Sequence, residues 1–197
     1  MSRSASLQRI YLLRHGQTTW SLSGQHTGRT DLPLTTAGEA EARALSGRLP
    51  ASGFAKVWSS PLQRARQTCV LAGLGARMAI DPDLAEWEYG DYEGLRLAEI
   101  RRDRPGWRIF RDGCPNGEMP ADVSARVDRL IARVRAVDGD VALCSHGHLG
   151  RALATRWVGL PIEAGGHFVL GTASVSVLGY EHEQIDEPAI VHWNIHV

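Results

Sequence analysis

Short apolar runs of buried-strand type recur along this chain, and the helical patterns between them limit the fold more than any other feature. Near the end of the sequence, two further runs at 174–180 and 189–195 alternate apolar and polar residues, and they are predicted to form the last strands. Strands that alternate with helices favour an α/β fold with a mostly parallel sheet. The buried-type runs are "RIYLL" (9–13), "FAKVW" (54–58), "RMAID" (77–81) and "DVALCS" (140–145).

Helix-start signals lie between these runs. Thr36 and Glu39 have the spacing of a capping box, which predicts a helix to about residue 49 after a long loop over 16–34. Ser60 precedes a proline, a pattern typical of an N-cap and a first helical turn, and predicts a helix to about residue 72. Two more helices are predicted, one from Pro120 and one over about 147–158.

The length and composition indicate one globular domain over residues 1–197. Of these residues, 43% are apolar and 22% are charged, which is ordinary for a soluble protein with a full core. Residues 1–8 are expected to form a polar arm. The glycine-rich stretch at about 87–119 has no regular pattern and is predicted to form a small cap-like insertion over the edge of the sheet.

Charge and cysteine usage exclude several classes of protein. The formal net charge is zero, which argues against a general nucleic-acid or membrane-surface binder. The three cysteines are odd in number and widely spaced, which does not fit a disulfide framework. Neither a signal peptide nor a run of membrane-spanning length is visible, so a cytoplasmic location is expected.

Unusual polar groups follow the predicted strands where each one ends. Arg14 and His15 follow the first strand, and His146 follows the strand at 140–145; Arg64 lies in the helix after the second. In open α/β sheets ligands bind outside the carboxyl ends of the strands, so these side chains are expected to meet in one crevice. Guanidinium groups, imidazoles and helix N-termini together favour an anion, and phosphate is the natural guest.

Five motifs carry a resemblance to a known family. They are "LRHGQT" (13–18), "TGRTDLPLT" (27–35), "SSPLQRARQT" (59–68), "EWEYGDYEG" (86–94) and "SHGH" (145–148). Together they resemble the histidine phosphatase superfamily. The resemblance implies a phosphoglycerate mutase-like three-layer α/β/α sandwich. "WRIFRDGCPNGE" (107–118) and "TRWVGLP" (155–161) are most similar to the small acid phosphatase and sugar-bisphosphatase branches.

The resemblance assigns roles to individual residues. It implies that His15 is the nucleophile of a phosphohistidine mechanism and that Glu86 is the general acid. The chemistry of the residues alone does not choose Glu86 over Glu88 or Glu93. Three cationic or imidazole groups would hold the phosphoryl oxygens: Arg14, Arg64 and His146. The implied substrate-binding residues are Gln17, Ser21, Thr27, Gly28, Tyr89, Gly147 and His148.

Some of these assignments leave an alternative open. Ser21 stands where the mutase branch often has Asn. Tyr89 could instead be a core residue, and His148 could contact substrate or cap the helix that follows it. The expected function is metal-independent and cofactor-independent hydrolysis of small phosphomonoesters, such as sugar or other metabolite phosphates. The late strands could pair to form a homodimer.

Other functions fit the motifs less well. From Cys144 to Arg151 there are six intervening residues, whereas the loop of a cysteine phosphatase needs five. Zinc bound by Cys144, His146 and His148 would lie beside arginines that repel a dication. A phosphoglycerate mutase and a non-catalytic phospholigand-binding protein of the same fold remain as alternatives. A mutase of this family has a lysine about eleven residues beyond the catalytic Glu, and this chain has Leu97 there.

Overall fold

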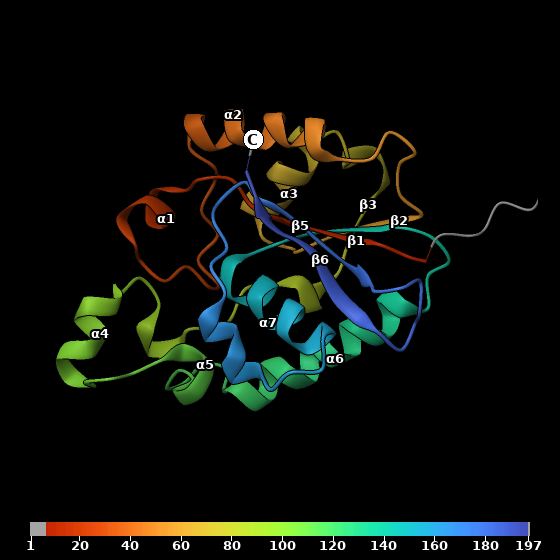
Figure 1. Ribbon diagram of the computed structural model, residues 1–197. Coiled ribbons are helices and arrows are strands. Elements are labelled where there is room, and N and C mark those ends of the chain that lie inside the picture. Colours follow the sequence, from red (N-terminus) through yellow and green to blue (C-terminus); the bar gives the residue numbers. More distant parts are fainter. Residues whose placement is uncertain (1–6, 197) are drawn as a thin grey trace, which may run out of the picture.

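The computed structural model describes residues 7–196, which form a six-stranded sheet with the strand order β3-β2-β4-β1-β5-β6 (Figure 1). The strands are β1 (Ile10–Arg14), β2 (Lys56–Ser59), β3 (Met78–Ile80), β4 (Val141–Ser145), β5 (Val175–Tyr180) and β6 (Pro188–Ile195). The pairs β1–β4, β2–β4 and β2–β3 are parallel, whereas β5 is antiparallel to both β1 and β6. A mostly parallel sheet is therefore confirmed.

Helices cover both faces of this sheet. In Figure 1, α2 and α3 lie above it and α6 and α7 below it, which confirms the three-layer sandwich. The helices are α1 (Thr19–Ser23), α2 (Thr36–Ala44), α3 (Gln63–Leu71), α4 (Leu97–Asp103), α5 (Ile109–Asp112), α6 (Pro120–Arg135) and α7 (Gly147–Trp157). Short 3-10 turns are η1 (Leu45–Arg48), η2 (Gly75–Arg77), η3 (Pro82–Leu84), η4 (Gly90–Tyr92) and η5 (Ile162–His167). In the part of the chain described, no helix has both the length and the apolar character needed to cross a bilayer.

The pleat of the strands divides the core between the two helical layers. Leu12 and Leu143 point to the cluster under α6 and α7, while Leu13 and Cys144, one position along, belong to the cluster under α2 and α3. Successive side chains of a strand face opposite sides of the sheet, so a strand with helices on both sides is apolar throughout. β5 is buried in this way along most of its length, and the two late strands predicted at 174–180 and 189–195 are confirmed as β5 and β6.

Two predicted helix starts differ from the structure. Thr35, not Thr36, caps α2: its backbone is extended and its side chain accepts a hydrogen bond from the N–H of Gly38. α3 begins at Gln63, because Ser60 instead accepts from the N–H of Leu62 and closes a turn before the helix. The loop predicted over 16–34 also contains the short helix α1.

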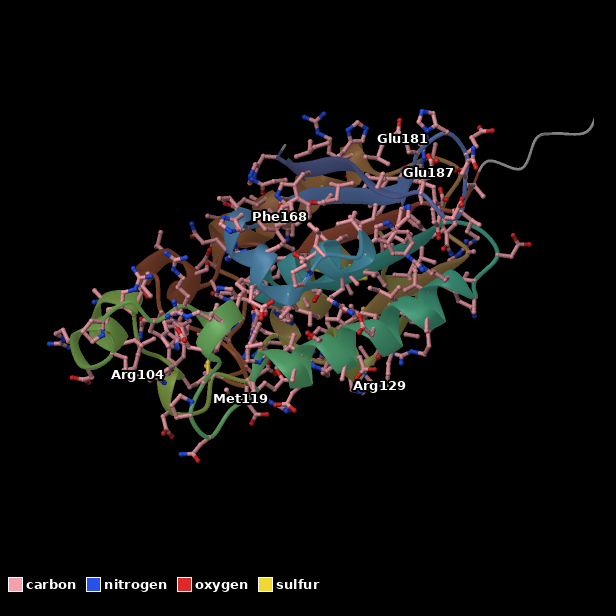
Figure 2. The ribbon with its side chains drawn as sticks, turned by 60° about the horizontal axis from the view of Figure 1, so that its bottom comes forward. Arg104, Met119, Arg129, Phe168, Glu181 and Glu187 are labelled. Atoms are coloured by element: carbon pink, nitrogen blue, oxygen red, sulfur yellow. The ribbon has the colours of Figure 1, made fainter. Side chains whose placement is uncertain are left out.

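The cap-like insertion predicted at about 87–119 contains η4, α4 and α5. It lies at one end of the molecule, where Figure 2 labels Arg104 and Met119; Glu181 and Glu187, between β5 and β6, lie at the other end. The domain limits stay a prediction, and residues 1–6 of the predicted polar arm lie outside the described residues.

Candidate active site

The register of the central strands brings the predicted histidines together. Arg14 pairs with Ser145 across β1 and β4, so His15 and His146 emerge side by side at the carboxyl edge. Their rings meet edge to face, with centroids 5.2 Å apart. Ser60 follows β2 at the same edge, and its hydroxyl lies 2.7 Å from Nε2 of His146. Three segments that are distant in the sequence therefore converge, as the strand-end argument predicted.

His15 is held as a neutral imidazole with one nitrogen available. Nδ1 lies 2.7 Å from the carbonyl oxygen of Gly16, which fixes the proton on Nδ1. Burial, with the nearby charges of Arg64 and Arg14, holds the pKa of His15 well below its ordinary value of 6.5. Within residues 7–196 no group hydrogen-bonds to Nε2, so this nitrogen has a lone pair for attack.

A small cavity of about 180 Å³, the first cavity, opens in front of His15. It is below the usual range of about 300–1,000 Å³ for sites that enclose a whole drug-sized ligand. The lining residues are Arg14, His15, Ser21, Gly24, Gln25, His26, Thr27, Glu86, Tyr89, Gly147, His148, Arg151 and Leu170. Seven of the predicted catalytic and substrate-binding side chains and the backbone of Gly147 thus share one cavity.

Arg14 places a guanidinium against the start of α7. Its Nη1 donates to the carbonyl oxygen of Leu170, and its Nε is buried without a partner among the described residues. A Cβ at position 147 would lie only 3.3 Å from Cζ of Arg14, so Gly147 permits the close approach. A buried N–H without a partner favours an anionic ligand in the cavity, because such a ligand would satisfy it.

Glu86 lies at the N-terminus of α7. Its Oε1 accepts hydrogen bonds from the N–H groups of Leu149 (2.8 Å) and Trp87 (2.9 Å), and its Oε2 accepts from the N–H of His148 (3.0 Å). The backbone N–H groups at the start of α7 thus fix the orientation of this carboxyl group. Both lone pairs of Oε1 are used, whereas Oε2 keeps one that can hold a proton.

The other two candidate acids are engaged elsewhere. Glu93 accepts from the N–H groups of Gly28 and Thr30 and so organises the loop that contains them. Glu88 pairs with Arg29 on the exposed surface. Of the three carboxylates that the chemistry of the sequence left open, only Glu86 lines the first cavity.

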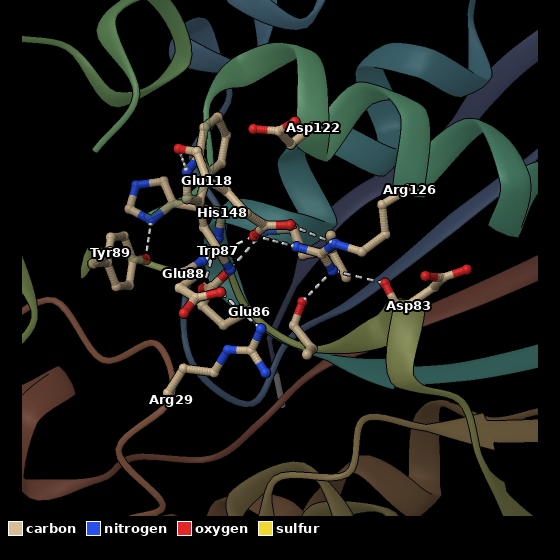
Figure 3. Close-up of polar contacts among 12 residues, drawn as sticks. Arg29, Asp83, Glu86, Trp87, Glu88, Tyr89, Glu118, Asp122, Arg126 and His148 are labelled. Atoms are coloured by element: carbon tan, nitrogen blue, oxygen red, sulfur yellow. Dashed lines mark hydrogen bonds and ion pairs between the residues drawn. The ribbon is translucent and has the colours of Figure 1, made fainter. Parts of the chain in front are cut away.

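A partly buried ion pair fixes the segment that carries Glu86 (Figure 3). Arg126 binds both carboxylate oxygens of Glu118 at 2.8 and 2.7 Å and donates to the carbonyl oxygen of Ala85 at 2.7 Å. Glu118 in turn accepts from the N–H of Glu88 at 2.9 Å. The residues on both sides of Glu86 are thus attached to one guanidinium–carboxylate fork, which we call the Arg126 clamp.

Arg64 and His146 lie behind His15 and do not line the first cavity. Each of the three Arg64 nitrogens donates to a protein acceptor: Nε to Nδ1 of His146, Nη1 to the carbonyl of Thr30, and Nη2 to the carbonyls of Thr27 and Gly28. Burial and Arg64 hold the pKa of His146 well below 6.5. Their predicted contact with a phosphoryl group stays a prediction and would require these bonds to be exchanged.

The predicted substrate-binding residues divide into two groups. Ser21, Thr27, Tyr89, Gly147 and His148 line the first cavity, whereas Gln17 and Gly28 do not. The side chain of Gln17 accepts from Thr35, and the N–H of Gly28 donates to Glu93.

Tyr89 and His148 interact within the first cavity. The hydroxyl of Tyr89 lies 2.6 Å from Nδ1 of His148. Burial raises the pKa of Tyr89 and lowers that of His148, so both side chains are neutral. The short contact is therefore a hydrogen bond between neutral groups that fixes both rings at the cavity wall.

Several lining residues were missed from the sequence. Gly24, Gln25 and His26 come from the loop before "TGRT", and Leu170 precedes β5. Arg151 is four residues after Gly147 on α7, so helical spacing places it on the same face and could have identified it. Its guanidinium lies over the ring of Phe110, 4.8 Å from the centroid.

The metal and cysteine alternatives find no support here. Within residues 7–196 no three His, Cys, Asp or Glu side chains are grouped as metal ligands. Cys144 belongs to the core under α2 and α3, away from the first cavity. Its neighbour Cys69 and burial raise the pKa of the Cys144 thiol well above 9.0, which disfavours a thiolate nucleophile.

Known proteins are similar to this chain in sequence and fold. Residues 10–196 match the profile of the histidine phosphatase superfamily (branch 1). An acid phosphatase of Mycobacterium tuberculosis is 42% identical, over 88% of this chain and 87% of its own length. A sedoheptulose 1,7-bisphosphatase of Saccharomyces cerevisiae is 34% identical, over 92% and 91%. A probable phosphoglycerate mutase of Photorhabdus laumondii is 30% identical, over 88% and 85%.

A solved structure agrees with these matches. The product of an open reading frame from Mycobacterium tuberculosis superimposes with a TM-score of 0.90 at 38% identity, and the match covers 96% of this chain and 98% of that one. The shared fold, the family profile over nearly the whole chain, and His15 and Glu86 facing one cavity agree with one another. The chain belongs to the histidine phosphatase superfamily.

Proposed function

We propose that this histidine phosphatase hydrolyses small phosphomonoesters, such as sugar or other metabolite phosphates, through a phosphohistidine formed at His15. The observation that carries the proposal is the neutral His15 ring, with Nδ1–H bound to Gly16 and Nε2 facing the first cavity beside Arg14 and Glu86. Relatives named acid phosphatase and sedoheptulose 1,7-bisphosphatase support the reaction class.

In the first step, Nε2 of His15 attacks phosphorus, and the bond between phosphorus and the ester oxygen breaks. The guanidinium of Arg14, whose buried Nε lacks a partner among the described residues, balances charge on the phosphoryl oxygens. The carbonyl of Gly16 stabilises the N–H of the phosphorylated ring. The leaving alcohol takes a proton as it departs.

Glu86 supplies that proton from Oε2, the carboxylate oxygen with a lone pair left over. In the second step, the same oxygen takes a proton from the water that attacks phosphohistidine, and phosphate is released. Bound N–H groups hold Oε1 throughout, so the carboxyl group keeps its orientation between the steps. No metal is required, because the cations that face the cavity are fixed arginines.

Phosphoglycerate mutase activity is the second candidate, since the superfamily includes a probable mutase 30% identical to this chain. Leu97 replaces the lysine typical of the mutases and lines a cavity adjoining the first. That replacement favours hydrolysis over return of the phosphoryl group to a bound intermediate. Incubation with 3-phosphoglycerate and a trace of 2,3-bisphosphoglycerate, followed by NMR, separates the two. Phosphate release without interconversion is expected, and rapid formation of 2-phosphoglycerate would overturn the proposal.

The central test is to trap the intermediate. The enzyme is mixed with p-nitrophenyl phosphate, quenched in alkali and digested, and the peptide containing His15 is analysed by mass spectrometry. An acid-labile phosphate on His15 and turnover that survives EDTA are expected. Binding without turnover would indicate the non-catalytic alternative, and activity restored to the EDTA-treated enzyme by one metal would indicate metal chemistry.

The same proposal includes the cell compartment and the partners. All three cysteines are free and buried, as is usual in a reducing compartment, and this supports a cytoplasmic enzyme. Its partner is a small phosphorylated metabolite, with no nucleic acid or membrane involved. A homodimer stays a prediction that sedimentation would test.

A further inference from the structure

A second cavity of about 590 Å³ adjoins the first. The two share His26, His148 and Arg151, so these three side chains form the junction between them. The second cavity has the size of a site for a small organic ligand, which the first does not. A phosphoryl group in front of His15 would therefore extend its ester substituent past this junction.

The floor of the second cavity is apolar and fixed. Trp107, Ile109 and Phe110 are 3%, 6% and 3% exposed. The indole N–H of Trp107 is bonded to the carbonyl of Gly113, so the ring presents only carbon surface to a ligand. Trp107 meets His26 edge to face at 5.6 Å, and Phe110 meets His148 in the same way at 5.6 Å. Such a floor suits an apolar or planar group.

The rim of the second cavity is exposed and mostly cationic. Its charged residues are Arg101, Arg108, Arg111 and Glu163. Arg101 donates to the carbonyl of Trp107, and Arg111 pairs with Asp112. In the part of the chain that the structure describes, no hydrogen bond or ion pair involves the guanidinium of Arg108. Arg108 is therefore the rim cation whose fork is available to a ligand.

We propose that the second cavity binds the leaving group of the substrate. The leaving group is an alcohol with an apolar or aromatic face and an anionic group, a carboxylate or a second phosphate, at its far end. The apolar face packs on Trp107 and Phe110, and the anion pairs with Arg108. This inference rests on the proposed function, because a leaving group is defined only if phosphoryl transfer occurs at His15.

The test compares two substrates that differ only in charge. The phosphate ester of phloretic acid and that of its amide have the same ring and nearly the same phenol, and only the acid carries a carboxylate. We expect kcat/KM to favour the acid about fivefold, the effect of one partly exposed ion pair. Arg108→Gln should abolish this preference by lowering kcat/KM for the acid ester, and the amide ester is the reference within each variant.

Arg102→Gln is the matched control. Arg102 is exposed on α4 beside Arg101 and does not line the second cavity, so the variant makes the same change in net charge elsewhere. It should retain the preference. Equal kcat/KM for the acid and the amide, or a preference insensitive to Arg108→Gln, would overturn the inference while the proposed function stands.

Failure to hydrolyse any of these esters would count against the proposed function instead. The cavity is then tested by calorimetry with phloretic acid alone. Binding that is lost in Arg108→Gln and kept in Arg102→Gln would support the second cavity as an anion-selective site. Binding that is absent, or equal in the two variants, would overturn it.

Discussion

The first and second cavities adjoin, yet their polar groups are held in different ways. In the first, His15 and Glu86 are buried, and bonds to Gly16 and to the start of α7 fix their orientations. In the second, charge lies on an exposed rim above an apolar floor, and Arg108 has no partner among the described residues. Fixed, buried groups stabilise the charge of a transition state strongly, whereas exposed groups in water contribute less to it and act mainly on which ligand binds. Changes in the first cavity should therefore lower turnover of every substrate, and changes in the second should depend on the substrate.

The largest effect that separates the two regions is expected from His15→Ala. The covalent route disappears with the nucleophile, so kcat should fall at least about a thousandfold for every phosphomonoester. His167→Ala, on the rim of the second cavity, is the control and should leave kcat for p-nitrophenyl phosphate nearly unchanged. Steady-state kinetics with both variants checks this. A His15→Ala enzyme with normal kcat would remove the distinction between the cavities.

Glu86→Gln tests whether Glu86 is the general acid, because the loss of activity should then depend on the leaving group of the substrate. An alkyl alcohol needs a proton as it departs and p-nitrophenolate does not, so alkyl phosphates should slow about a hundredfold and p-nitrophenyl phosphate much less. Single-turnover rates of phosphorylation for the two substrates provide the measurement. Equal slowing of both would assign Glu86 an electrostatic role only.

The Arg126 clamp links the first cavity to the insertion, and Arg126→Lys tests the link. Lysine keeps the charge but lacks the fork that bonds Glu118 and Ala85 together. We expect about a tenfold loss on alkyl phosphates and a smaller one on p-nitrophenyl phosphate, the same pattern as Glu86→Gln, because the position of Glu86 is disturbed.

Arg129→Gln is the control for that experiment. Arg129 lies on the outer face of α6 (Figure 2) and pairs with Asp83 at 3.0 Å, with 59% of its side chain exposed. An exposed pair contributes little, so the activity of this variant should be normal. If Arg126→Lys slows both substrates equally, or if Arg129→Gln has the same effect, the clamp supports the fold and does not position Glu86.

The sequence predicted part of the first cavity from local patterns and part of it only through the family resemblance. Strand ends at 14 and 145 follow from local apolar patterns, and the neighbouring strands bring His15 and His146 together. Choosing Glu86 required the family resemblance, because its partners are backbone N–H groups of α7, some sixty residues away. Glu88 and Glu93 look the same in the sequence, and only tertiary contacts show that they are used elsewhere.

The second cavity was not predictable in this way. It forms where the irregular 97–111 segment meets η5, and neither region has a hydrophobic period that fixes how the two pack. Gln17 and Gly28 were selected from motifs alone, yet their groups bond to Thr35 and Glu93 within the protein. Motif position therefore selected residues most of which line one cavity, and the hydrogen-bond partners of each group decided which residues do not.

The smallest expected effect per residue concerns pH, and it too separates buried from exposed groups. The pKa values of His15, His146 and His148 are held well below 6.5, mainly by burial. In the unfolded chain these imidazoles take up protons near pH 6.5, so the unfolded state binds more protons and the free energy of unfolding falls as pH drops below that value.

Between pH 7.5 and 5.5 each of the three should cost about 1 kcal/mol of stability. His182 has the opposite sign: Glu187 raises its pKa, so protonation there favours the folded state. Urea unfolding at the two pH values, with His182→Gln as the exposed control and His146→Asn as the buried one, measures both contributions. The decrease should be smaller in His146→Asn and slightly larger in His182→Gln. If His146→Asn and the unaltered protein lose the same stability between the two pH values, burial does not hold His146 neutral, and the same argument for a neutral His15 would fail.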